Sequence, residues 1–399
     1  MWVLTRLGAK VLDHERKNMK LRRKIACTIW LVVSFELGIS VAGQTKPQSE
    51  LKTRNVVLIV TDGLRWQEVF QGPDHSLMNR EHGGVENIDT LRTDFSRATS
   101  SQSRETVFPF LWKTFAHQGQ IFGNQEKESI ARVANQYAFS YPGYNEMIAG
   151  FPDPHVDKND FGPNPNVTVF EWLNRIPELQ GRVAVFGTWD AFKDIFNQKR
   201  SGLFISAGWD PIARAESRAR QALIEDFYST TTRLWDDNVY DAFLQPVVLD
   251  YVQAHQPRVL FVGYGETDEW AHSGRYDLLL RAAHQFDKFV EQLWNTMQSM
   301  PSYRDQTTFI ITTDHGRGSG LTGWKDHGTE QKGSENIWIG VFGPDTQPLG
   351  EREHAPAVTQ SQIAATLAAL LGKDYRGSVP QAAKPLPDVV ATRTSSTVK

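Results

Sequence analysis

The sequence predicts one α/β domain, a doubly wound and mostly parallel sheet with helices on both faces. Short apolar runs rich in β-branched residues, which are typical of buried strands, alternate along the chain with segments of helical periodicity. Of the 399 residues, 40% are hydrophobic and 22% are charged, so the chain has enough apolar side chains for one large core. We place this domain at residues 52–375.

The N-terminal segment, residues 1–43, has the pattern of a signal peptide. Met19 is followed by a basic cluster and then by an apolar stretch over residues 25–41 that ends in small residues. We therefore expect Met19 to be the true start and residues 1–43 to be removed on export. An uncleaved anchor is the alternative, although the stretch is short and contains Glu36, which makes it a poor permanent membrane span.

The cysteine content and the net charge limit the cellular compartment and the binding partners that we expect. The only cysteine, Cys27, lies in the segment that we expect to be removed, so the exported chain would hold neither a disulfide nor a thiolate metal site. This favours a bacterial periplasm, or secretion, over a eukaryotic secretory route. The formal net charge of −3 provides no basic surface, so we expect no binding to nucleic-acid polymers.

Five apolar runs predict the strands of the sheet. The first is the strongest, because Asn55 to Val60 is almost wholly branched and apolar and leads directly into Thr61-Asp62-Gly63. The others also stop abruptly at polar residues or glycine, as buried strands do where they enter a loop. In chain order the runs are residues 55–60, 182–186, 258–262, 309–311 and 336–342.

Helical periodicity or capping residues predict helices between these strands. The predicted helices are residues 104–118, 140–150, 167–173, most of 211–256, and 276–297. In the second of them we expect Ser140 to be the N-cap, Pro142 to lie in the first turn, and Gly150 to end the helix.

The remaining segments predict loops and a tail. Residues 71–90 are rich in glycine and mixed charge, and residues 151–166 contain several prolines, so we expect both to be loops. The segment 376–399 is rich in Pro, Ala, Ser and Thr, which predicts a disordered tail.

Acidic residues and histidines follow three of the predicted strands, at the point where each strand ends. Because parallel strands bring their carboxyl ends to one edge of a sheet, we expect these side chains to converge. A further histidine, in Lys325-Asp326-His327-Gly328, lies in the loop before the last predicted strand. The full set of predicted metal ligands is Asp62, Asp268, His272, Asp314, His315 and His327.

Carboxylate oxygens beside imidazole nitrogens suit zinc, with manganese as the alternative. The number of ligands predicts two divalent ions. One group would consist of Asp62, Asp314 and His315, and the other of Asp268, His272 and His327. Two such ions would act on the attacking and leaving oxygens of an in-line displacement.

A site of this kind needs a nucleophile, and Ser140 is the best candidate. At a helix N-terminus, backbone N–H groups and the helix dipole favour the anionic oxygens of a bound phosphate. Coordination of the hydroxyl to a metal would lower its pKa enough for attack near neutral pH. Without the acidic and histidine clusters, a plain helix cap would be the better interpretation of Ser140.

Taken together, these motifs resemble the alkaline phosphatase superfamily, and within it the nucleotide pyrophosphatase/phosphodiesterase branch. The resemblance spans about residues 55–345. Its motifs are a strand followed by Asp-Gly, a Thr or Ser nucleophile before an aromatic-Pro pair, and then Asp-x-x-x-His, Asp-His and His-Gly. The matching residues are Asp62-Gly63, Ser140-Tyr141-Pro142, Asp268 with His272, Asp314-His315, and His327-Gly328.

The resemblance implies an alkaline-phosphatase-like fold and adds two site assignments. Ser140 would join the ligands of the nucleophile-side metal, and an asparagine some twenty residues later would bind a phosphate oxygen. Asn159 is the nearest match to that asparagine, while Asn164 and Asn166 compete with it.

The chain departs from the branch in two ways. The gap between Asp62 and Ser140 is longer than usual, so the insert at 71–135 would shape the pocket differently, and Thr106, at nearer the usual spacing, is the rival nucleophile. Ser140-x-Pro142 is also similar to sulfatases, but Tyr144 stands where their arginine would be, which argues against formylglycine maturation.

The sequence therefore predicts a hydrolase of small phosphate esters, a phosphodiesterase or a phosphatase, that works through a phosphoserine. A phosphomutase or phosphotransferase on the same fold is the alternative. Phosphoglycerate mutases of this superfamily carry a large inserted domain after the nucleophile, and the short interval between Ser140 and Asp268 leaves little room for one. A sulfatase and a non-catalytic binding protein are less favoured.

Overall fold

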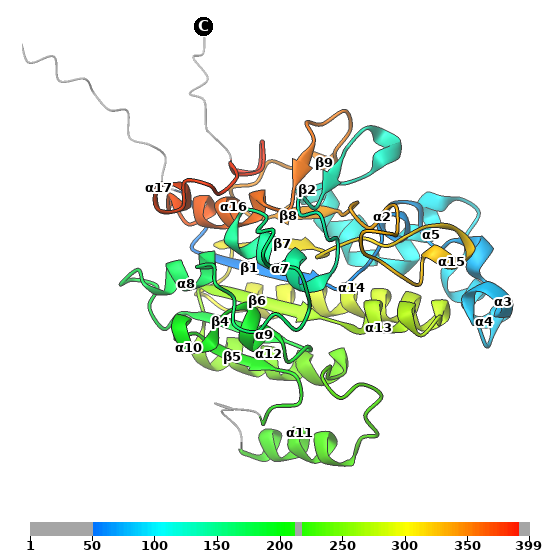
Figure 1. The fold of residues 1–399 in the computed structure, drawn as a ribbon, viewed down its shortest axis with the longest axis horizontal. Helices are drawn as coiled ribbons and strands as arrows, with labels where there is room; N and C mark the ends of the chain where they lie inside the picture. The colour runs from blue at the N-terminus through cyan, green and yellow to red at the C-terminus, as the bar shows by residue number, and fades with distance from the viewer. Residues whose placement is uncertain (1–50, 212–217, 391–399) are drawn as a thin grey trace, which may run out of the picture. The chain divides into compact units, whose positions relative to one another are not determined.

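A computed structural model describes residues 51–211 and 218–390 of the chain. Its centre is an eight-stranded sheet with the order β5-β4-β6-β1-β7-β8-β2-β9 (Figure 1). The strands of this sheet are β1 (Asn55–Thr61), β2 (Gly119–Phe122), β4 (Val183–Gly187), β5 (Phe204–Ala207), β6 (Val259–Tyr264), β7 (Thr307–Thr312), β8 (Ile339–Phe342) and β9 (Gly350–Glu351). A separate pair joins β3 (Ala131–Arg132) and β10 (Val358–Thr359).

The middle of the sheet is parallel, as predicted. Strand β1 lies between β6 and β7, where Val57 is in register with Leu260 and with Phe309. Strands β4 and β5 continue the parallel part, while β8 pairs antiparallel with both β7 and β2. The three strands at the centre therefore deliver their carboxyl ends side by side at one edge.

Strand β1 is buried on both faces because its side chains alternate between two hydrophobic clusters. Val57 and Ile59 belong to one cluster, whereas Val56, Leu58 and Val60 belong to the other, and all five are at most 1% exposed. Full burial of a side chain of this size contributes roughly 1.5–3 kcal/mol relative to leaving it in water. This explains why the run at 55–60 is apolar throughout instead of alternating with polar residues.

Helices cover both faces of the sheet, so the predicted doubly wound α/β class is confirmed. The helices that contribute buried side chains to the Val57 cluster are α2 (Trp66–Gln71), η1 (His75–Leu77), α4 (Ile88–Phe95), α5 (Ser100–Val107), η2 (Leu111–Phe115), α6 (Ala116–Gln118), α11 (Arg218–Thr230), α12 (Asp241–His255), α13 (Glu266–His272) and α14 (Tyr276–Ser299). Those that contribute to the Val56 cluster are α7 (Ser140–Ala149), α8 (Val169–Asn174), α9 (Phe192–Ile195), α16 (Gln362–Leu370) and α17 (Tyr375–Ser378).

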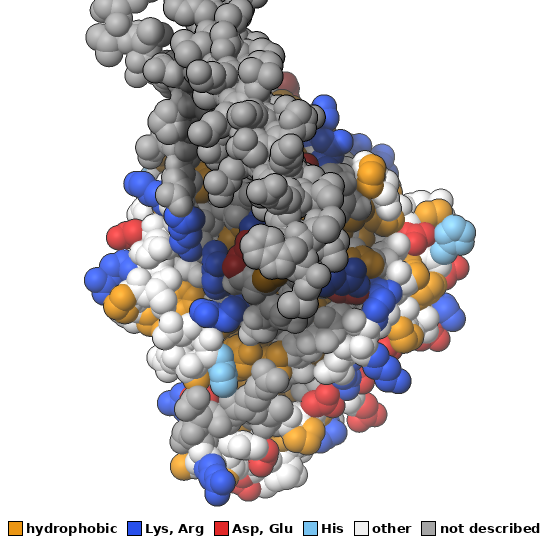
Figure 2. Space-filling view, turned by 90° about the vertical axis from the view of Figure 1, so that its left-hand side faces the viewer, with side chains coloured by type: hydrophobic (Ala, Val, Ile, Leu, Met, Phe, Trp, Pro, Cys, Tyr) orange, Lys and Arg blue, Asp and Glu red, His pale blue; other side chains and the backbone are white. Residues whose placement is uncertain are grey.

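Short elements complete the described part of the chain. They are α3 (Arg80–Gly83), η3 (Gln125–Lys127), α10 (Gln198–Ser201) and α15 (Gly320–Gly323). None of the helices in residues 51–211 and 218–390 is long and apolar enough to cross a membrane. On the face drawn in Figure 2, basic and acidic side chains are interspersed wherever described residues are visible.

The insert at 71–135 is more helical than predicted, and its helices are shorter. The expected loop over 71–90 contains η1, α3 and the start of α4. The expected helix over 104–118 is broken, because α5 ends at Val107 and a π-helical turn begins at Leu111. Pro109 accounts for this interruption, since the residue before a proline is disfavoured in helical conformation.

Asp287, on α14, holds the helical turn that follows Pro109. Its carboxylate accepts hydrogen bonds from the backbone N–H of Phe110 at 2.7 Å and of Leu111 at 2.9 Å, and its side chain is buried. Burial raises the pKa of this carboxyl to about 7, against the lowering effect of the two N–H donors. Besides the pairing of β2 with β8, this buried side chain is a further attachment of the insert to the domain.

We expect Asp287→Ala to lower the free energy of unfolding by about 2–4 kcal/mol, because it leaves two buried N–H donors without an acceptor. Chemical denaturation measures this difference. The control is Glu291→Ala, one turn further along α14 on an exposed side chain, which should change stability by less than about 0.5 kcal/mol. Equal effects of the two substitutions would contradict the anchoring role.

The predicted tail is ordered up to residue 390, so the prediction of disorder is wrong for residues 376–390. Ala382, Leu386 and Val389 are buried in the Val56 cluster, and the backbone N–H of Ala383 donates to the carbonyl of Gly150 at 2.8 Å. The segment looked polar because these apolar residues are widely spaced between prolines and small residues. The last part, 391–399, and the predicted signal peptide, 1–43, lie outside the described residues.

Candidate metal centre

Three neighbouring strands bring the predicted ligands together at the carboxyl edge of the sheet. Asp62 directly follows β1, Asp314 follows β7, and Asp268 lies in α13, which begins just after β6. Since the sheet order is β6-β1-β7, the three carboxylates converge on one place. Open α/β sheets bind ligands at this edge.

The first ligand group consists of Asp62, Asp314 and His315, all of them buried. The Nε2 atom of His315 lies 3.2 Å from Asp62 Oδ1 and 3.5 Å from Asp314 Oδ2. Neither of these carboxylate oxygens has a hydrogen-bond partner among the described residues, although both are buried. Unpaired buried oxygens are costly, and a cation between them would remove the cost.

The pKa shifts of Asp62 and Asp314 also indicate a cation between these two carboxylates. Burial raises the pKa of Asp62 well above its usual range, and the charge of Asp268 adds to the shift. Burial likewise raises the pKa of Asp314, with the charge of Asp62 adding to it. Two carboxylates this close in a buried site ionise together only when a cation balances them, so the residues fit a divalent ion.

His315 presents a free lone pair to this group. Its Nδ1 atom lies 2.8 Å from the carbonyl oxygen of Gly316, which can only accept, so Nδ1 carries the proton. In the neutral imidazole the opposite nitrogen, Nε2, carries the lone pair, and it faces the carboxylates. A hydrogen bond from the far nitrogen is the usual way in which a ligating imidazole is oriented.

Ser140 lies at the same place, on the first turn of α7. Its Oγ atom is 3.2 Å from His315 Nε2, and the side chain is buried. The structure corrects one detail, because the N-cap is Phe139 and Ser140 is the first helical residue. The extended Phe139 supplies the carbonyl that accepts from Gly143 N–H at 3.0 Å, so the hydroxyl of Ser140 is not used as a cap.

The second predicted group, Asp268, His272 and His327, also comes together. His272 Nε2 lies 3.2 Å from Asp268 Oδ2 and 3.0 Å from His327 Nε2, and His327 Nε2 lies 3.6 Å from Asp268 Oδ1. Burial lowers the pKa of His327 to about 2, and the nearby His315 adds to the shift, so this imidazole is neutral. Ligand atoms of Asp268, His315 and His327 also lie within 4.8 Å of one another, so His315 connects the two groups.

Two residues of the site were missed in the sequence. Arg317 is buried, and its guanidinium contacts Asp268 Oδ1. Tyr144, one turn after Ser140 on α7, donates its hydroxyl to Asp62 Oδ2 at 3.2 Å. The only sequence signal for Arg317 was its position directly after Asp314-His315-Gly316. Tyr144 was considered in the sequence only because sulfatases have an arginine at that position.

The structure separates the competing asparagines. Asn159 is exposed, and its Oδ1 accepts from the backbone N–H of Tyr141 at 3.0 Å, so it lies beside the start of α7. Asn164 is buried and bonds to the carbonyl of Ile195, while Asn166 donates to Asn145. Asn159 is therefore the one of the three that lies beside the nucleophile, and its side-chain nitrogen makes no hydrogen bond within residues 51–211 and 218–390.

Thr106 is not brought to this cluster. It lies near the end of α5, where its hydroxyl donates to the backbone carbonyls of Phe95 at 3.1 Å and Ser103 at 2.7 Å. The spacing argument in its favour failed because the insert at 71–135 places a helix, and not the nucleophile, at that distance from Asp62.

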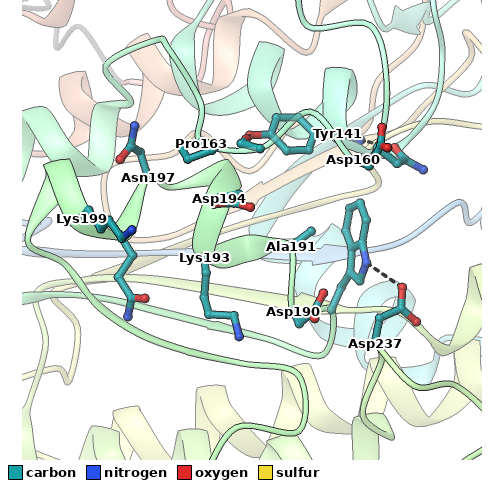
Figure 3. A pocket seen from close by; sticks show the side chains of 14 residues that line it. Tyr141, Asp160, Pro163, Asp190, Ala191, Lys193, Asp194, Asn197, Lys199 and Asp237 are labelled. Carbon is teal, nitrogen blue, oxygen red and sulfur yellow. Dashed lines mark hydrogen bonds between the residues drawn. The ribbon is translucent and has the colours of Figure 1, made fainter.

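A pocket of about 650 Å³ opens next to the start of α7 (Figure 3). Tyr141 and Asn159 line it near Ser140, and Trp189 lines it from the end of β4. Trp189 donates its indole N–H to Asp237 at 3.1 Å, which fixes the ring. In Figure 3 Tyr141 and Lys199 lie on opposite sides of the pocket, and the charged side chains that line it are Asp160, Asp190, Asp194, Asp237, Lys193 and Lys199.

Gly63 is required where Asp62 leaves β1. Its φ is +59°, and a Cβ atom there would lie 2.6 Å from Asp268 Oδ1 and 2.7 Å from Arg317 Nη1. We expect Gly63→Ala to displace these groups and lower activity on the order of a hundredfold, since small misplacements have such effects. Turnover and metal content measure this.

Gly202 supplies the matched control for that substitution. Its φ is +62°, but nothing lies within 4 Å of the added Cβ, so Gly202→Ala carries the same backbone strain in open space. We expect both variants to lose about 1–2 kcal/mol of stability, and Gly63→Ala alone to lose activity. Equal activity of the two variants would show that the site tolerates the displacement.

Comparison with known proteins agrees with this architecture. Residues 226–374 match the family model described as Metalloenzyme superfamily, whereas no curated protein matches the chain. The phosphonate monoester hydrolase of Silicibacter pomeroyi superposes with a TM-score of 0.52 at 12% identity, over 87% of this chain and 78% of that chain. A Bacteroides thetaiotaomicron protein from work on glycosaminoglycan metabolism superposes with a TM-score of 0.52 at 12% identity, over 86% of this chain and 78% of that chain.

A Vibrio parahaemolyticus protein in the alkaline phosphatase superfamily gives a TM-score of 0.46 at 16% identity, over 85% of this chain and 71% of that chain. At these identities the likeness concerns the fold. The nucleotide pyrophosphatase/phosphodiesterase branch stays a prediction. The match over residues 226–374 and the fold shared with the two structures at a TM-score of 0.52 agree with the predicted alkaline-phosphatase-like α/β fold.

Proposed function

We propose that this protein is an exported, metal-dependent hydrolase of phosphate esters that works through a phosphoserine at Ser140. The observation that carries the proposal is the convergence of a buried serine hydroxyl, two unpaired buried carboxylate oxygens and a lone-pair nitrogen at a helix N-terminus. This combination suits an anionic substrate held between cations and backbone N–H groups.

The residues present divide into two ligand sets. Asp62, Asp314, His315 and the hydroxyl of Ser140 would hold one divalent ion, and Asp268, His272 and His327 the other. We propose zinc for both, because mixed imidazole and carboxylate sets suit it, with manganese as the alternative. When bound, the ions polarise the phosphoryl group, lower the pKa of the serine hydroxyl and stabilise charge on the leaving oxygen.

The protein's own groups orient the reaction. In the first turn of α7, Tyr141 N–H donates to Asn159 Oδ1 and Pro142 has no N–H, so the backbone N–H of Ser140 would face the phosphoryl oxygens, and the side-chain amide nitrogen of Asn159 would supply one more donor. Tyr144 and the backbone N–H of Gly63 fix Asp62 and Asp314, at 3.2 Å and 3.1 Å respectively. The ligand carboxylates therefore keep one orientation during turnover.

Two displacements complete the reaction. In the first, Ser140 Oγ gives up its proton to solvent and forms a bond to phosphorus while the bond to the leaving alcohol breaks, and the leaving oxygen takes up a proton from solvent. In the second, water forms a bond to phosphorus while the Oγ–P bond breaks, which returns the serine and releases phosphate or a phosphomonoester. The organic group would occupy the pocket lined by Tyr141 and Trp189.

Substrate panels test this proposal. Purified protein is stripped of metal with a chelator, resupplied with zinc or manganese, and assayed on p-nitrophenyl phosphate, bis-p-nitrophenyl phosphate, the p-nitrophenyl ester of thymidine monophosphate, and p-nitrophenyl sulfate. We expect phosphate-ester hydrolysis to be lost on chelation and restored by metal. Faster hydrolysis of the sulfate ester, or full activity in a preparation free of metal, would refute the proposal.

Export is part of the same proposal. We expect the mature chain to begin near Gly43 or Gln44, because the apolar stretch ends in small residues there. N-terminal sequencing of the protein from the periplasmic fraction of an expressing bacterium measures this. A product that begins at Met1 and stays in the cytoplasm would contradict it.

A further inference from the structure

Arg317 distinguishes the second ligand group from the first. It is 1% exposed, and all of its polar groups are engaged: Nε donates to the carbonyl of Trp324 at 2.9 Å, Nη2 donates to that of Lys325 at 2.7 Å, and Nη1 contacts Asp268 Oδ1. The guanidinium thus holds Asp268 and also the segment that leads to His327. A permanently charged cation is built into this side of the centre.

The first group has no such cation in contact with it among the described residues. The hydrogen-bond donors to Asp62 and Asp314 are the neutral hydroxyl of Tyr144 and the neutral N–H of Gly63. One oxygen of each carboxylate has no hydrogen-bond partner there. Two carboxylates on this side face no contacting cation, while the single carboxylate on the other side already pairs with one.

We propose that Arg317 makes the two ion sites unequal, so that the group Asp62, Asp314 and His315 binds its divalent ion tightly and the group Asp268, His272 and His327 binds its ion more weakly. The inference rests on the metal centre of the proposed function. It adds the order in which the two ion sites are filled. Arg317 is a positioning residue that sets the charge and geometry of the second site.

Charge balance explains the direction of this difference. A divalent ion in the second group is repelled by the guanidinium that contacts its only carboxylate ligand, and that contact occupies one of the two carboxylate oxygens. Repulsion between close charges in a partly buried site is large enough to change an affinity by at least about tenfold. An ion in the first group gains two carboxylates, and the guanidinium of Arg317 contacts neither of them but contacts Asp268 of the second group.

Calorimetric titration of the metal-free full chain with zinc, and separately with manganese, tests the inference. We expect two binding steps whose dissociation constants differ by at least about tenfold. Asp62→Asn should remove the tight step, and Asp268→Asn the weak step. Two steps of equal affinity, or loss of the tight step in Asp268→Asn, would overturn the inference.

Substitution of Arg317 tests the cause. Arg317→Met should tighten the weak step by at least about tenfold, while Arg317→Lys, which keeps a charge, should leave it weak. The control is Arg104→Met, because Arg104 is a part-buried arginine that pairs with Glu351 outside the centre, and it should leave both steps unchanged. An unchanged weak step in a folded Arg317→Met variant would overturn the assigned cause.

The two proposals can fail separately. Circular dichroism shows whether Arg317→Met folds, and if it does not, the titrations of Asp62→Asn and Asp268→Asn still decide whether the sites are unequal. These titrations use no ester substrate. A protein with two unequal ion sites that hydrolyses no phosphate ester would refute the proposed function and leave the inequality in place.

Discussion

Ser140→Ala is expected to lower the turnover of phosphate esters by at least about a thousandfold while both ions still bind. The loss is large because the variant has no hydroxyl to form a bond to phosphorus. Metal binding survives because carboxylates and imidazoles supply the rest of both ligand sets. Steady-state kinetics and elemental analysis of the same preparation measure the two quantities.

Thr106→Ala is the matched control, because Thr106 was the rival nucleophile. Its hydroxyl is engaged with two backbone carbonyls on α5, so the variant should stay within about tenfold of wild type. If Thr106→Ala lost its activity and Ser140→Ala kept it, the assignment of α7 to the centre would be wrong.

His315→Ala is expected to lose the nucleophile-side ion and nearly all activity, at least about a thousandfold. The imidazole contacts Ser140, Asp62 and Asp314, and its ligand atoms also adjoin the second group, so its removal disturbs both sets. Elemental analysis and kinetics check the prediction.

His284→Ala is the control for that variant. His284 is a half-buried histidine whose Nδ1 bonds to the carbonyl of Val107 away from the centre. It should keep its metal and its activity. A His315→Ala protein with full metal content would contradict the ligand assignment.

The central part of the fold could be predicted because its signals are local. The run at 55–60 is apolar on both faces, and so are the runs at 182–186, 258–262 and 309–311, which matches strands covered by helices on two sides. The position of the ligands at strand ends then followed from parallel topology alone. The structure brings Asp62, Asp268 and Asp314 together for that reason.

The contacts between distant segments could not be predicted. Arg317 lies in a part of the chain where an exposed arginine is ordinary, and only the fold brings it to Asp268. The helical turn after Pro109 is held by the buried Asp287, which is 177 residues from its partner Phe110. The ordered segment up to residue 390 depends on packing against α16 and α7, which its composition does not reveal.

In the pocket, too, the position of a residue could be predicted, but its contacts could not. Trp189 could be expected near the end of a strand, but neither its orientation toward the pocket nor its bond to Asp237 was visible in the sequence. Asn159 could be named among three asparagines only because of the resemblance. Its contact with the backbone of Tyr141 is what distinguishes it.

Acid quenching during turnover tests the phosphoserine most directly. Metal-loaded protein is mixed with excess phosphate ester, quenched at low pH, digested and examined by mass spectrometry. Phosphate should appear on the peptide that contains Ser140, and it should be absent from the Ser140→Ala protein. Phosphate on the peptide that contains Thr106, or an active enzyme from which no phosphopeptide can be trapped at any quench time, would contradict a covalent intermediate at Ser140.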